Sequence, residues 1–133
     1  MPITLWQQLV VSACSLIGLY TCYAFYAESI GDPRFCVNGA CSLLSRTRYY
    51  RLFYFPNWYY GTVLYLALML AMALNLPAFN LLVGLGAIAA FLTSMVLIWA
   101  LTTQLHTTCR NCYIAHACNM AILLSLGLAY FTR

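Results

Sequence analysis

Two cysteines three residues apart lie near the C-terminal end of the chain, in the segment TTCRNCYIAHACN at 107–119. Residues i and i+3 of a helix share one face and lie about 5–6 Å apart, a separation that a disulfide can close. Cys109 and Cys112 can therefore be oxidised together. A helix N-terminus and the neighbouring Arg110 both favour the thiolate of Cys109, while Cys112 lies about 4.5 Å deeper along the helix axis. We predict one thiol facing water and the other facing an apolar interior.

A second pair, Cys36 and Cys41, lies in the segment CVNGACS. Two nearby pairs, one exposed and one embedded, form a relay for thiol–disulfide exchange, which is the interpretation we prefer. Two alternatives remain open. The four cysteines can hold zinc or copper, with His116 as a further ligand, or they can act as a structural staple. We expect no metal. The other three cysteines fall inside apolar runs and are expected to behave as small hydrophobes: Cys14, Cys22 and Cys118.

The composition places these cysteines in a membrane protein. The 133-residue chain is 65% hydrophobic and 6% charged, whereas soluble domains average about 45–50% apolar and 25% charged residues. Its six basic residues are all arginines, and its only acids are Glu28 and Asp32. So few charges provide no basic stripe for nucleic acid. We therefore exclude nucleic acid as a partner.

Four apolar stretches are long enough to cross a bilayer, which takes about 20 helical residues. The sequence predicts an all-α, polytopic fold, a four-transmembrane-helix bundle in one domain over 1–133, with a long loop at 28–56 that caps one end. Pro77 is expected to stop the second helix and to allow a tight turn. The predicted spans are about 5–27, 57–76, 79–103 and 109–131. Small residues on the last two spans allow close helix contact: Gly84, Gly86, Ala87, Ala90 and Gly127.

Four spans bring both termini to one side of the membrane and both cysteine pairs to the other. A relay that ends inside a bilayer needs an acceptor that dissolves there, and a lipid quinone of the ubiquinone or menaquinone type is the obvious candidate. Polar side chains within spans are functional candidates. Asn57, His116 and Asn119 are such residues, and we expect them to line the quinone pocket; the alternative is that each only hydrogen-bonds a neighbouring helix.

The order of these motifs resembles the vitamin K epoxide reductase family, including its prokaryotic disulfide-generating members. The resemblance covers nearly the whole chain and rests on CVNGACS after the first span, NWYYG at the start of the second and CRNCYIAHACN at the start of the fourth. It implies that Cys36 exchanges with a thioredoxin-like partner, that Cys41 exchanges with Cys109, and that Cys112 faces the quinone.

The same resemblance implies roles for the polar residues of the spans. Asn57 corresponds to an asparagine that hydrogen-bonds a quinone carbonyl, and Asn119 to another asparagine one turn below the active helix face. His116 stands where the vertebrate enzymes carry a tyrosine of the quinone pocket, which disfavours vitamin K epoxide as substrate. The implied enzyme is a thiol:quinone oxidoreductase that generates disulfides in a separate thioredoxin-like protein. The alternatives are a reductase acting chiefly on the quinone or vitamin K epoxide, and a non-enzymatic metal-binding or structural membrane module.

Two arguments about membrane orientation oppose each other. Arginine-rich connections tend to stay in the cytoplasm, whereas disulfide generators usually face an oxidising outer compartment. We predict a multi-pass protein of a prokaryotic plasma (inner) membrane with its active face in the cytoplasm; the periplasmic or extracytoplasmic face is the alternative. The arginines on the active side are Arg34, Arg46, Arg48, Arg51 and Arg110.

Overall fold

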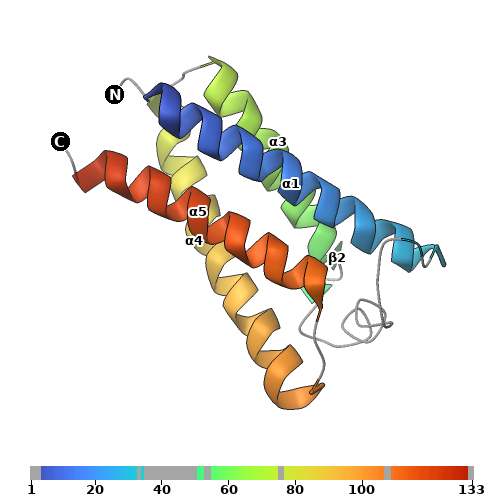
Figure 1. The fold of residues 1–133 in the computed structure, drawn as a ribbon. Helices are drawn as coiled ribbons and strands as arrows, with labels where there is room; N and C mark the ends of the chain where they lie inside the picture. The colour runs from blue at the N-terminus through green and yellow to red at the C-terminus, as the bar shows by residue number, and fades with distance from the viewer. Residues whose placement is uncertain are drawn as a thin grey trace.

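A computed structural model describes residues 4–32, 34, 51–52, 55–74, 77–106 and 109–131. Within these ranges, four helices are long and apolar enough to cross a membrane. This confirms the predicted all-α, polytopic fold. Both termini lie at the same end of the bundle (Figure 1). The helices are α1 (Leu5–Ser29), α3 (Asn57–Leu74), α4 (Pro77–Trp99) and α5 (Arg110–Phe131), and the π-helix η3 (Ala100–Gln104) continues α4.

The connections differ from expectation at two places. A short antiparallel pairing of β1 (Arg51–Leu52) with β2 (Phe55–Pro56) leads into α3, where the sequence predicted only loop. Pro77 begins α4 instead of stopping the helix before it, which ends at Leu74. The first turn of a helix tolerates proline because the N–H there has no partner within the helix. The central part of the predicted cap, with Cys36 and Cys41, lies outside the described residues.

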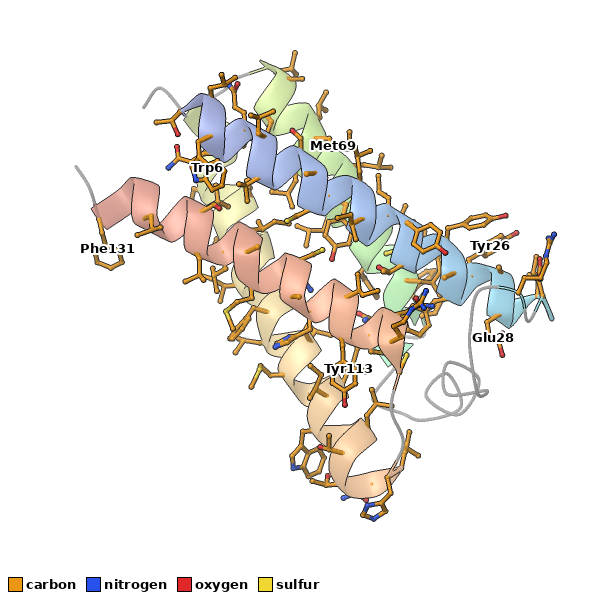
Figure 2. All side chains as sticks on the ribbon, in the orientation of Figure 1. Trp6, Tyr26, Glu28, Met69, Tyr113 and Phe131 are labelled. Carbon is orange, nitrogen blue, oxygen red and sulfur yellow. The ribbon has the colours of Figure 1, made fainter. Side chains whose placement is uncertain are left out.

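The outer surface of the bundle is apolar. Leu5 on α1 and Leu81 on α4 are each 72% exposed, which suits contact with lipid rather than with water. Figure 2 shows Trp6 and Phe131 at the end that carries the termini, and Tyr26 towards the opposite end. Aromatic rings at both ends of an apolar zone are typical of the two interfaces of a bilayer.

Glycines allow α3 to approach its neighbours closely. In the bundle, α1 packs against α3 and α5, and α4 packs against α5 and α3. A Cβ at Gly18 would overlap the phenol ring of Tyr65, and one at Gly86 would lie 2.7 Å from Cδ1 of Leu64. A Cβ at Gly84 or Gly127 would meet nothing within 4 Å. The expected role in close contact is therefore confirmed for Gly86 but is wrong for Gly84 and Gly127.

Candidate functional site

The cysteine pair lies at the start of α5. The sulfurs of Cys109 and Cys112 are 2.7 Å apart, and the residues are only 2% and 7% exposed. The thiol of Cys112 donates a hydrogen bond to the sulfur of Cys109, and the backbone N–H of Cys112 donates another at 3.4 Å. The carbonyl of Cys109 accepts from the N–H of Tyr113, so Cys109 occupies the N-cap position. The pair is placed for joint oxidation. Because both cysteines are buried, the prediction that one thiol faces water is wrong.

Hydrogen bonds lower the pKa of Cys109 below its ordinary value. The thiol of Cys112 has the largest effect, burial acts in the opposite direction, and the backbone N–H groups of Cys112 and Asn111 add to the lowering. Each donor stabilises the charged form of the sulfur more than the neutral form. The thiolate is the species that reacts with disulfides, and the lowered pKa of Cys109 favours this form.

Cys112 also lines a partly open cavity of about 280 Å³, which is walled by residues of all four membrane-length helices. The lining is mainly apolar, and Asn57 from α3 and Asn119 from α5 contribute polar groups to it. Its volume is near the lower end of the roughly 300–1,000 Å³ typical of small-molecule sites, which leaves room for a single ring. The structure thus brings three of the predicted site residues to one cavity.

His116 takes a different position. Its ring stacks on Phe91 of α4 at a centroid distance of 5.7 Å, and it is not among the described residues that line the cavity. Its Nδ1 is buried and has no hydrogen-bond partner within the described part of the chain. Successive residues of a helix are rotated by about 100° around its axis. Viewed down this axis, His116 therefore lies about 40° to one side of Cys112. Ala115 and Asn119 lie to the other side, by about 60° and about 20°. The cavity lies on the side of Ala115 and Asn119, so the role of His116 stays a prediction.

Asn119 is held by two buried hydrogen bonds that join three helices. The hydroxyl of Tyr65 donates to its Oδ1 at 2.6 Å, and its Nδ2 donates to Oγ of Ser94 at 2.7 Å. All three residues line the cavity, so these bonds fix the orientation of an amide in its wall. Sequence reasoning missed Tyr65 and Ser94. Both residues carry a hydroxyl group within an apolar span, and a polar side chain within a span is the signal by which the sequence analysis selected Asn119.

Four membrane-length helices hold a buried cysteine pair, one member of which lines a cavity, and this arrangement agrees with a helical membrane oxidoreductase. The family model of the vitamin K epoxide reductase family matches residues 9–126, a range that includes every predicted site residue. The chain belongs to this family, in agreement with its motifs. No match is found among curated proteins.

Proposed function

We propose that the protein is a thiol:quinone oxidoreductase that generates disulfides in a thioredoxin-like partner. One observation carries the proposal: the sulfur of Cys112 lies 2.7 Å from that of Cys109, and Cys112 also lines the cavity. Chemistry at the cysteine pair is therefore in direct contact with a space inside the bundle. Such contact is needed if electrons from thiols leave through a lipid-soluble acceptor.

The cavity lining fits a quinone ring. Apolar side chains such as Leu97 and Ala115 form much of the wall. Asn57 carries an amide N–H that would donate to a carbonyl oxygen, in agreement with its place in the family motif. The chemistry that the quinone supplies when bound is the acceptance of two electrons and two protons, by which the Cys109–Cys112 disulfide is restored.

The remaining steps belong to the cysteines. In the proposed cycle, thiols of the partner reduce the Cys36–Cys41 disulfide, and the partner itself is left with a disulfide. The thiolate of Cys41 then attacks the sulfur of Cys109 in the oxidised pair. The bond between Cys109 and Cys112 breaks as the bond to Cys41 forms, and Cys112 leaves with the electron pair. When the second thiol of the loop pair displaces Cys109, both cysteines of the α5 pair are reduced.

The test is consumption of quinone by the purified protein when it receives a reduced thioredoxin-like donor. Ubiquinone and menaquinone are tried in turn, and absorbance follows their reduction. We expect activity in the wild type and none in Cys112→Ser. Cys118→Ser is the matched control on the same helix, because Cys118 does not belong to the described cavity lining, and it should remain active. Full activity in Cys112→Ser would refute the proposal, and no reaction in any protein would favour the metal-binding or structural alternative.

We also propose that the protein resides in a prokaryotic plasma membrane with this site facing the cytoplasm. Within the described residues, Arg34 and Arg51 lie beyond the spans at the site end of the bundle, and Arg110 is the first residue of the fourth span at the same end, where the positive-inside rule applies. Labelling of intact cells with a membrane-impermeant thiol reagent tests the orientation. Protection of Cys36 is expected, and its modification from outside would place the site on the extracytoplasmic face.

A further inference from the structure

A second contact between cysteines lies within the membrane-spanning part of the bundle, apart from the α5 pair. Cys14 on α1 and Cys118 on α5 bring their thiols close enough to interact electrostatically. Cys118 is buried, and the half-buried Cys14 packs against a core cluster that includes Val11 and Ile122. Neither cysteine is among the described residues of the cavity wall. This contact has no part in the cycle described above.

The register of the two helices places these cysteines at one level by a separate observation. α1 and α5 run antiparallel (Figure 1), and the side chain of Gln7 donates a hydrogen bond to the carbonyl of Ser125 at 3.3 Å. Cys14 follows Gln7 by seven residues, and Cys118 precedes Ser125 by seven. Seven residues make about two turns and about 10.5 Å on either helix. Starting from the contact between Gln7 and Ser125, seven residues along each antiparallel helix therefore place Cys14 and Cys118 on the facing sides of α1 and α5 and at the same depth in the membrane.

We propose that Cys14 and Cys118 are a second redox pair, which forms a disulfide between α1 and α5 inside the bilayer. Formation of one S–S bond releases two electrons and two protons from the two thiols. A lipid-soluble quinone takes up both and becomes a quinol. Water-soluble disulfides cannot enter the span, whereas the half-buried Cys14 is accessible to a reagent dissolved in the surrounding lipid.

The disulfide would tie together two walls of the cavity. α1 carries Thr21 and Cys22 of the lining, and α5 carries Cys112 and Asn119. A bond between positions 14 and 118 closes a loop of 104 residues, the difference between the two positions, and restricts the unfolded chain. Oxidation should therefore raise the midpoint of thermal unfolding, and a membrane-permeant thiol should reverse the shift.

Cleavage at methionine provides the test. A protein that retains Cys14 and Cys118 as its only cysteines is reconstituted in lipid, treated with a short-chain ubiquinone and cut with cyanogen bromide. Because Met69, Met72 and Met95 lie between the two cysteines, their fragments stay together only through a disulfide. We expect a linked species that reductant separates, and the loss of two hydrogen atoms from the intact mass. In the wild type, a Cys41–Cys109 bond of the proposed cycle would link the same two fragments, so tandem mass spectrometry of the linked species must locate the bond between Cys14 and Cys118.

The matched control keeps Cys22 and Cys118 in place of Cys14 and Cys118. Cys22 lies on the same helix as Cys14 but about two turns further along, so no linked species is expected. The proposal is supported if a Cys14–Cys118 bond links the fragments in the two-cysteine protein and in the wild type, and if the control protein shows no linked fragments. Equal linkage in the control would show that the register is not responsible, and no linkage after oxidation of the wild type would overturn the proposal.

Discussion

Replacement of Gly18 by alanine tests how the wall of the cavity is assembled. A Cβ at this position would overlap the phenol ring of Tyr65. Tyr65 is only 3% exposed, and its hydroxyl donates the 2.6 Å hydrogen bond to Asn119. A ring displaced by the new methyl group would lose that bond. The substitution is therefore expected to disturb both the packing of α1 on α3 and the orientation of Asn119.

Three contributions set the size of the effect. Overpacking of a filled interior costs about 1–3 kcal/mol. Loss of an interhelical hydrogen bond in a membrane protein costs about 0.6 kcal/mol on average and about 1.7 kcal/mol at most. Alanine regains up to about 1 kcal/mol of helix propensity over glycine. Because the last two contributions largely offset each other, we expect the free energy of unfolding to fall by about 1–3 kcal/mol.

Titration of the purified protein with a denaturing detergent in mixed micelles measures this free energy. Gly84→Ala and Gly127→Ala are matched controls, because a Cβ at either position meets nothing within 4 Å; their stability should equal that of the wild type or exceed it by up to about 1 kcal/mol. Tyr65→Leu removes the ring, so adding it to Gly18→Ala should recover part of the loss. A Gly18→Ala protein as stable as the two controls would refute the close contact between α1 and α3.

Three further predictions concern the site. In the reduced protein, half-maximal alkylation of Cys109 should occur at a lower pH than for an ordinary thiol, because the hydrogen bond from Cys112 lowers its pKa; Cys112→Ala should move the midpoint to higher pH, and an unchanged midpoint would contradict this cause. Tyr65→Phe keeps the ring but removes the donor to Asn119, so detergent titration should show a loss of about 0.6–1.7 kcal/mol, and no loss would argue against the bond. Asn57→Ala should raise the KM for quinone about tenfold in initial-rate measurements, if its amide contributes roughly 1–1.5 kcal/mol; an unchanged KM would remove Asn57 from the binding site.

The fold could be predicted closely because the length and hydropathy of a span are local properties. Each predicted span coincides with a helix, and the boundaries shift by only a few residues. The pairing of β1 with β2 was missed, because two-residue strands carry no periodic pattern. Pro77 shows a related limit: proline marks a boundary between helices, but only the structure shows that it opens α4 rather than closing α3.

For the site, polarity within an apolar span singled out Asn57, His116 and Asn119 but could not show which way each side chain points. Asn57 and Asn119 line the cavity with Cys112, while His116 stacks on Phe91 instead. The spacing from Cys112 to His116 indicates a shared helix face about 100° wide or more. Which edge of that face meets the cavity depends on how α4 and α5 pack, and the sequence of α5 alone carries no information on this.

By itself the sequence determined the membrane class, the number of spans and the placement of a cysteine pair at one end of the last span, because each follows from composition or from spacing within a single segment. Only the tertiary structure decided that Tyr65, Ser94 and Asn119 join three helices around a cavity. It alone also brought Cys14 to the level of Cys118. These contacts connect residues far apart in the chain, and their register is set by side-chain packing between helices, which no local period in the sequence encodes.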